Sequence, residues 1–281
     1  MPGETIPDET IPDETIPNYA LLDRAGVASS MFYPRPAEGA PPRGATDHLI
    51  EVEPGVEVGA RFYASERSGP TLLYFHGNGE IASDHDDIAP LYHEVGLNLF
   101  VAEFRGYGSS GGQPSVAALV ADAHPLSDFF HAALDEGGFS ESRFLMGRSL
   151  GAHPALELAA NDDRRFRGLI LESGAGNIRR MLGRTGLLDT EVGGRLAAAH
   201  EAKIRSVVLP TLLIHGERDD LVPLSAAREL HELLAGASRS LVVIPHAGHN
   251  DILWLGQRQY FEAIHRFVTH SAGGQDLDRS P

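Results

Sequence analysis

The fold of this chain is decided by the stretch Leu145-Met146-Gly147-Arg148-Ser149-Leu150-Gly151-Ala152. Its centre matches the pattern Gly-x-Ser-x-Gly. A serine hydroxyl becomes an effective nucleophile only when it is held clear of the fold and within reach of a base. A sharp turn from a strand into a helix does this, and glycines relieve the crowding of such a turn because they lack Cβ. The stretch therefore predicts a reactive Ser149, although a glycine-rich turn with a chance serine would look the same.

The residues on either side of the motif fit this turn. Residues 142–146 can form a short buried strand, and residues 152–160 are mostly typical of a helix. Pro154 fits near the start of that helix, where a missing N–H group costs little.

Length and composition predict one large α/β domain without cysteine-based chemistry. The chain has 281 residues and no cysteine, which excludes disulfides, thiolate catalysis and cysteine zinc sites. No apolar run approaches the roughly 20 residues that span a bilayer, and the N-terminus does not resemble a secretory signal. We therefore expect no membrane span and a cytoplasmic location.

The charge balance argues against nucleic acid and anionic membranes as partners. The formal net charge is −16, with 39 acidic against 23 basic residues. Such a surface repels nucleic acid and anionic membranes, so we expect a small-molecule substrate. The composition leaves the oligomeric state open.

Both ends of the chain are expected to lie outside the folded domain. Residues 3–17 repeat the unit Glu-Thr-Ile-Pro-Asp, and this acidic, proline-interrupted composition predicts a disordered tail over residues 1–17. Residues 18–46 form a proline-rich lead-in, of which residues 31–34 are expected to pack on the domain. Residues 271–281 are expected to be a flexible tail.

The remaining residues, 47–270, alternate between apolar strands and helices. The expected strands are 48–52, 56–63, 71–75, 97–104, 142–146, 169–172, 211–215 and 240–244. The expected helices are 80–95, 115–134, 152–160, 224–235 and 251–269. This alternation is typical of an α/β fold with a mainly parallel central sheet covered by helices on both faces.

One stretch interrupts the alternation. Residues 174–205 are longer than a usual connection and contain two short helical pieces, 178–182 and 195–203. Two interpretations are open: a small lid over a pocket, or a simple excursion on the surface.

A serine nucleophile needs a base, and the base needs an acid that orients it. Asp219 follows the strand 211–215, and His249 follows the strand 240–244. Open α/β sheets place their sites at such strand ends, and the chain order Ser149, Asp219, His249 suits a hydrolytic triad. The alternatives for the acid are Asp220 and Glu172. The alternative for the base is His246.

The motifs together resemble those of the alpha/beta-hydrolases over about residues 30–270. The motifs that carry the resemblance are Phe75-His76-Gly77-Asn78-Gly79, Phe104-Arg105-Gly106-Tyr107-Gly108-Ser109, residues 147–151, His215-Gly216 with Asp219, and Gly248-His249-Asn250-Asp251. The branch that they resemble is the cap-poor serine hydrolases, which include proteins similar to serine aminopeptidases and depalmitoylases. The pair Glu103-Phe104, where relatives often have Asp-Tyr, departs from the pattern.

The resemblance implies a serine hydrolase without metal or cofactor that acts on esters or thioesters. It implies catalytic roles for Ser149, Asp219 and His249, and an oxyanion hole formed by the backbone N–H groups of Leu150 and Asn78. The expected substrate pocket includes Gly79, Met181 and Leu182, the last two supplied by the possible lid. A peptidase or amidase with the same triad is one alternative, and a non-catalytic binding protein on this scaffold is another.

Two further patterns are interpreted as structural. Residues 106–111 fit Gly-x-Gly-x-x-Gly, but residues 112–114 prevent a helix from starting there, so no helix N-terminus faces a pyrophosphate. Residues 84–87, Asp-His-Asp-Asp, suggest metal ligands, but consecutive residues on a helix point in different directions. We expect residues 106–111 to form a loop and residues 84–87 to form an exposed helix start.

Overall fold

The computed structural model describes residues 17–26, 30–161, 164–174, 176, 178–234 and 238–272. The tail predicted over residues 1–17 lies outside the described residues except for Pro17. The tail predicted over residues 271–281 lies outside them except for its first two residues.

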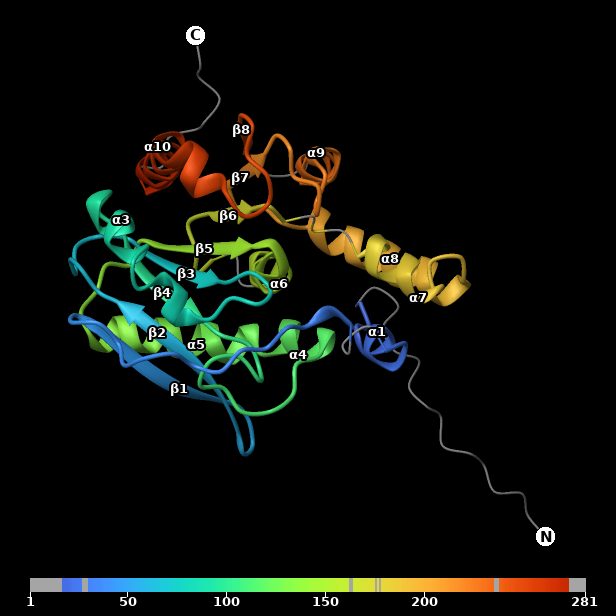
Figure 1. Cartoon of the computed structure of the whole chain (residues 1–281), viewed down its shortest axis with the longest axis horizontal. Coiled ribbons are helices and arrows are strands. Elements are labelled where there is room, and N and C mark those ends of the chain that lie inside the picture. Colours follow the sequence, from blue (N-terminus) through green and yellow to red (C-terminus); the bar gives the residue numbers. More distant parts are fainter. Residues whose placement is uncertain are drawn as a thin grey trace.

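Eight strands form one sheet in the order β1-β2-β4-β3-β5-β6-β7-β8 (Figure 1). β2 pairs in the antiparallel sense with β1 and β4, and the other neighbours are parallel. The strands are β1 (Ala45–Glu53), β2 (Val56–Tyr63), β3 (Thr71–Phe75), β4 (Asn98–Ala102), β5 (Arg143–Arg148), β6 (Leu169–Glu172), β7 (Thr211–Gly216) and β8 (Arg239–Ile244). The prediction of a mainly parallel sheet flanked by helices is confirmed.

The central strands are apolar because both faces of the sheet are covered. Along β3, Leu73 and Phe75 join one core cluster, while Leu72 and Tyr74 join the other. The helices that pack on the first face include α4 (Val116–Ala121), α5 (Ala123–Glu136), α6 (Ala152–Asn161) and α9 (Leu224–Leu233). Those on the second face include α3 (Ala89–Glu94) and α10 (Ile252–Ala272), which lie together in Figure 1.

Two of the expected helices are interrupted, and proline explains both interruptions. The helix expected over 80–95 is a 3₁₀ turn, Ala82–His85, followed by α3, in whose first turn Pro90 lies. The helix expected over 115–134 is divided at Asp122 into α4 and α5. Pro125 has no N–H group to bond to the carbonyl of Ala121, and its ring would clash with that carbonyl, so α4 ends there.

The lead-in packs closely on the domain. It contains a short helix, α1 (Ala20–Arg24), whose Asp23 carboxylate accepts the backbone N–H groups of Val116 (2.7 Å) and Ala117 (3.0 Å). This contact satisfies free donors at the start of α4. Phe32 is buried in the core farther along the lead-in. These contacts bring the residues around Phe32 to the edge of the sheet where the parallel strands end.

The stretch 174–205 contains α7 (Arg179–Thr185) and α8 (Glu191–Arg205), which project beyond the sheet beside α1 (Figure 1). α8 begins four residues earlier than the sequence pattern predicts. The reason is Thr190, whose hydroxyl accepts the N–H of Gly193 at 3.1 Å and so caps the helix. Among the described residues, no helix is both long and apolar enough to cross a membrane.

Candidate active site

Ser149 lies immediately after β5, on the tight turn that the motif predicts. Its φ is +50°, a backbone conformation that residues other than glycine rarely adopt. A Cβ atom on Gly147 would lie 2.3 Å from the carbonyl oxygen of Gly151, and one on Gly151 would lie 2.1 Å from that of Phe75. Both glycines are therefore required by backbone contact, and together they allow the turn that presents the serine.

Asp219, His249 and Ser149 form a continuous chain of hydrogen bonds. His249 Nδ1 lies 2.7 Å from Asp219 Oδ2, and His249 Nε2 lies 3.0 Å from Ser149 Oγ. Asp219 follows β7 and His249 follows β8, so the ends of three parallel strands bring the residues together. When Nδ1 donates to the carboxylate, Nε2 is free to accept the serine proton.

Asp219 is held in its charged form. It is 6% exposed, and burial alone would raise its pKa, but hydrogen bonds from His249 and from the backbone N–H of Val222 outweigh burial and lower the pKa. Its Oδ1 accepts the N–H groups of Leu221 (3.0 Å) and Val222 (2.7 Å). The side chain is thereby fixed with Oδ2 toward the imidazole.

The alternative candidates for acid and base lie elsewhere. Asp220 is exposed. Glu172 accepts hydrogen bonds from Arg148 Nε (3.1 Å) and the Tyr260 hydroxyl (2.7 Å). His246 Nδ1 lies 3.5 Å from Glu217 on the surface. The structure brings none of the three into hydrogen-bond contact with the Ser149–His249 pair.

Asn78 and Leu150, the expected oxyanion-hole residues, both line the same pocket as Ser149. The side chain of Asn78 is occupied by other contacts: its Oδ1 accepts the Tyr107 hydroxyl (2.7 Å) and the N–H of Tyr33 (3.1 Å). These bonds join the loop after β3 to the loop after β4 and to the lead-in. They hold the loop in place and leave the backbone N–H of Asn78 as the group for the predicted role.

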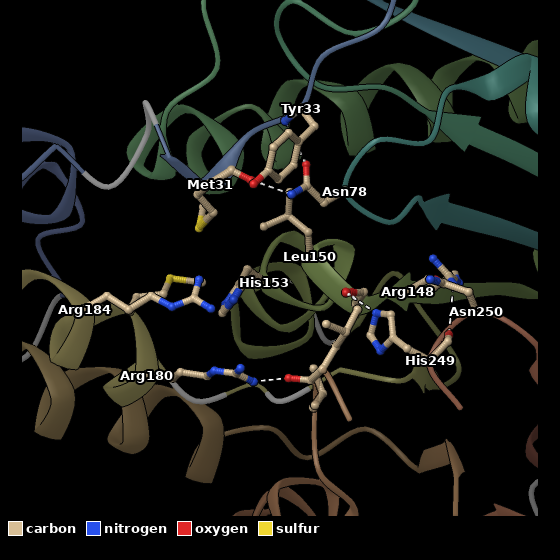
Figure 2. A pocket seen from close by; sticks show the side chains of 14 residues that line it. Met31, Tyr33, Asn78, Arg148, Leu150, His153, Arg180, Arg184, His249 and Asn250 are labelled. Carbon is tan, nitrogen blue, oxygen red and sulfur yellow. Dashed lines mark hydrogen bonds between the residues drawn. The ribbon is translucent and has the colours of Figure 1, made fainter. Parts of the chain in front are cut away.

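The pocket around Ser149 has a volume of about 360 Å³ (Figure 2). Of the three expected pocket residues, Met181 lines it, and Gly79 and Leu182 do not. Leu182 is fully buried in the core, whereas Met181, about 100° away around α7, packs beside the same core and also lines the pocket. The carbonyl of Gly79 accepts Arg35 Nη1 at 3.0 Å, on the side of the lead-in. The lining residues are Met31, Tyr33, Asn78, Arg148, Ser149, Leu150, His153, Arg180, Met181, Arg184, Leu221, Val222, His249 and Asn250.

Arg148 occupies an unspecified position of the motif and holds the loop that carries His249 in place. Its Nη2 donates to the carbonyl of His249 (3.0 Å) and to Asn250 Oδ1 (2.9 Å), while its other nitrogens bind Glu80 and Glu172. Burial disfavours its charge, but the two carboxylates outweigh burial and raise its pKa. The sequence signal was only its place in the motif, which does not reveal partners distant along the chain.

We expect Arg148→Met to lower the free energy of unfolding by about 3–5 kcal/mol, because the buried Glu172 and the half-buried Glu80 would be left without a cation. Denaturant unfolding measures this loss. The control is Arg35→Met, which removes a more exposed pair with Asp84 and should cost less than about 1 kcal/mol. A loss of less than about 1 kcal/mol in Arg148→Met would show that the Arg148 cluster does not stabilise the fold.

A second group of polar residues lies beneath the pocket. His153 lines the pocket and its ring centroid lies 5.9 Å from that of His200. Burial, with repulsion from His200 and Lys203, lowers the pKa of His153 to about 3. Its imidazole is therefore neutral at neutral pH.

This shift predicts a pH dependence of stability. The unfolded chain binds a proton at His153 below pH 6.5, whereas the folded chain does so only near pH 3, so stability is lost as the pH falls through this window. The contribution is about 1.4 kcal/mol per pH unit. His153→Gln should weaken the decline by that amount between pH 6 and pH 5, as measured by denaturant unfolding. The same slope in both proteins would contradict the prediction.

The glycine-rich loop at 106–111 packs on Glu103, the residue at which the chain departs from the family pattern. Glu103 Oε2 accepts the N–H of Ser109 at 2.9 Å, and Oε1 accepts that of Ala82 at 3.0 Å. A Cβ atom on Gly108 would lie 1.8 Å from the carboxylate. Gly108 is thus accounted for by close contact with a buried carboxylate, and Gly106 by its φ of +78°.

Two of the three acidic residues at 84–87 bind arginines of other segments, and His85 is buried, so the stretch is only in part the exposed helix start that the sequence predicts. Asp84 Oδ2 accepts Arg35 Nη1 at 2.9 Å, which joins the lead-in to the 3₁₀ turn. Asp86 Oδ1 accepts Arg61 Nη1 at 2.9 Å, which joins that turn to β2. Their positions are accounted for by these ion pairs.

Comparison with known proteins identifies several relatives. Residues 67–192 match the family described as serine aminopeptidase, S33. The chain is 32% identical over 240 residues to an uncharacterized protein of Mycobacterium tuberculosis, covering 80% of each chain. It is also 32% identical over 226 residues to the alpha/beta hydrolase domain-containing protein 17C of Xenopus laevis, covering 78% of this chain and 68% of that protein.

Solved structures agree with this fold. The esterase Pf2001 of Pyrococcus furiosus superposes with a TM-score of 0.66 at 18% identity. The match covers 85% of this chain and 99% of the esterase. At this identity the likeness supports the fold and not the substrate.

Proposed function

The chain belongs to the alpha/beta-hydrolase superfamily, and we propose that it is a serine hydrolase that cleaves carboxylic esters or thioesters through an acyl-enzyme on Ser149. The observation that carries the proposal is the chain of hydrogen bonds from Asp219 through His249 to Ser149. It lies at a strand-to-helix turn that opens into a pocket.

In the proposed reaction, His249 Nε2 takes the proton of Ser149 as Oγ attacks the substrate carbonyl. The tetrahedral intermediate collapses, the bond to the leaving group breaks, and His249 returns the proton to the departing oxygen or sulfur. Water, deprotonated by the same nitrogen, then attacks the acyl-enzyme. The acid product leaves and Ser149 regains its proton.

The other residues stabilise the charges of this reaction. Asp219, kept ionised by its hydrogen bonds, orients the imidazole and stabilises the imidazolium. The backbone N–H groups of Leu150 and Asn78 would bind the oxyanion, and loss of one such donor costs about 2.7–4 kcal/mol in other hydrolases. Arg148, bonded to the carbonyl of His249, is a positioning residue for the base.

A lid role for the 174–205 stretch is part of the proposal. Met181 of α7 lines the pocket together with Leu150 and Val222, which supplies apolar surface for an acyl or alcohol group. The volume of about 360 Å³ is near the lower end of the roughly 300–1,000 Å³ of small-molecule sites. This size favours short acyl groups.

Peptidase or amidase activity is the second candidate, because the matched family is described as a serine aminopeptidase. The same three residues can attack an amide carbonyl, so a substrate screen must decide. A panel of p-nitrophenyl esters, thioesters and aminoacyl anilides tests both. Faster turnover of anilides than of esters would replace the esterase proposal by the peptidase one.

A fluorophosphonate probe tests whether the protein is an enzyme at all. We expect stoichiometric labelling of the purified full chain, with the adduct mapped to Ser149 by peptide mass spectrometry. Ser173→Ala is the matched control, because Ser173 also has a φ of +50° but does not line the pocket. Absence of an adduct on Ser149 would favour a binding protein on this scaffold.

A further inference from the structure

The pocket carries a charge opposite to that of the protein. The whole chain has a formal net charge of −16, yet none of the described residues that line the pocket is Asp or Glu. Three of the lining residues are arginines: Arg148, Arg180 and Arg184. An acidic protein that surrounds one pocket with arginines and no carboxylates creates a local site for anions.

The three arginines differ in what neutralises them. Arg148 is paired with two carboxylates and is not available to a ligand. Arg180 donates to the backbone carbonyl of Leu221, and within the part of the chain that the structure describes neither Arg180 nor Arg184 has an ion-pair partner. The neighbouring Arg179, in contrast, binds Glu201 at 2.7 Å. The guanidinium groups of Arg180 and Arg184 are therefore not neutralised by a carboxylate of the described residues, and they can bind an anion in the pocket.

The placement of Arg180 is not explained by the stability of α7. Arg180 and Arg184 are four residues apart, so they lie on one face of the helix, where like charges repel. Arg180 is also in the first turn, where the helix dipole disfavours a cation, whereas Arg184 is in the last turn, where the dipole favours one. In Figure 2 both side chains extend from α7 into the pocket, on the side opposite His249.

We infer that the substrate is an ester or thioester bearing an anionic group, a carboxylate or a phosphate, which Arg180 and Arg184 bind while Ser149 attacks the carbonyl. This inference rests on the proposed function and adds a substrate class to it. A guanidinium presents several N–H donors in one plane and matches the oxygens of carboxylate and phosphate. The pair on one helix face can hold such a group from two directions.

The first test compares matched esters on the wild-type protein. Mono-p-nitrophenyl glutarate carries a free carboxylate on its acyl group, and its methyl ester is the neutral match. The para-butanoyloxy derivatives of benzoate and of phenyl phosphate place the anion on the leaving group and separate carboxylate from phosphate, with methyl para-butanoyloxybenzoate as their neutral match. We expect kcat/KM to be about ten- to a hundredfold higher for at least one anionic member than for its neutral match. Equal values throughout would overturn the inference.

The second test uses variants of α7. The double variant Arg180→Gln, Arg184→Gln should reduce that ratio to near unity, the double lysine variant should restore part of it, and Arg179→Gln should leave it unchanged. The neutral ester is the internal reference, because any general damage to the site lowers both rates. A ratio that persists in the double glutamine variant would overturn the inference.

A binding measurement separates this inference from the proposed function. If the wild-type protein hydrolysed no ester, the proposed function would fail, while the anion site could still be measured. Calorimetry on Ser149→Ala should then detect monomethyl glutarate but not dimethyl glutarate. Adding the double glutamine change should abolish the binding. Binding of dimethyl glutarate as tight as that of monomethyl glutarate would overturn the anion site itself.

Discussion

Ser149→Ala is expected to reduce ester hydrolysis by roughly 10⁴- to 10⁶-fold while the protein remains folded. The variant removes only Oγ, whose hydrogen-bond partner is His249 Nε2 at 3.0 Å. The turn itself is set by Gly147 and Gly151 and does not depend on the hydroxyl. The measurements are kcat on a p-nitrophenyl ester and the melting temperature.

Ser173→Ala is the control for this experiment. Ser173 follows β6, has the same φ of +50°, and is fully buried away from the pocket. Its variant should keep the wild-type rate, so a loss confined to Ser149→Ala reports chemistry and not backbone strain. A Ser149→Ala protein that retained a tenth of the wild-type rate would contradict the assignment of Ser149 as the nucleophile.

The features predictable from the sequence are those with local causes. The turn at Ser149 follows from two glycines that must contact neighbouring backbone, and this requirement is visible as residue spacing. Asp219 and His249 each follow an apolar strand, and parallel strands end at one edge of the sheet, but only the match to the family motifs separated them from Asp220 and His246. The alternation of strands and helices fixed the fold class in the same way.

Other features depend on contacts between distant segments, which the sequence pattern does not show. Tyr33 lines the pocket because the lead-in crosses the loop after β3 and bonds to Asn78 there. Leu182 was expected in the pocket beside Met181, but the orientation of α7 buries Leu182 in the core and leaves only Met181 at the pocket. The breaks at Pro90 and Pro125 had a visible local cause that the apolar pattern obscured.

The residues that bear on the substrate were the hardest to predict. Arg180 and Arg184 are ordinary surface arginines by sequence, in a chain where nearly all basic residues are arginines. Only the packing of α7 over the edge of the sheet makes them part of the pocket. In our proposal, substrate preference therefore depends on how α7 packs on the domain.

The prediction that discriminates most sharply compares two adjacent acids. Asp219→Asn should reduce kcat by about 10⁴-fold, as in a related triad, because an amide can donate to Nδ1 and stabilise the wrong imidazole tautomer. Asp219 Oδ2 lies 2.7 Å from His249 Nδ1, and its Oδ1 is held by two backbone N–H groups, so no other residue can replace it without moving the loop.

Asp220→Asn should change kcat less than about tenfold, because Asp220 is exposed and surface substitutions usually have small effects. The two variants differ by one position and by the same chemical change, so effects on solubility or on the net charge cancel between them. If the effects of the two variants were exchanged, the catalytic acid would be Asp220 and not Asp219. If both variants kept the wild-type rate, His249 would act without Asp219, and the hydrogen bond between them would have to be structural.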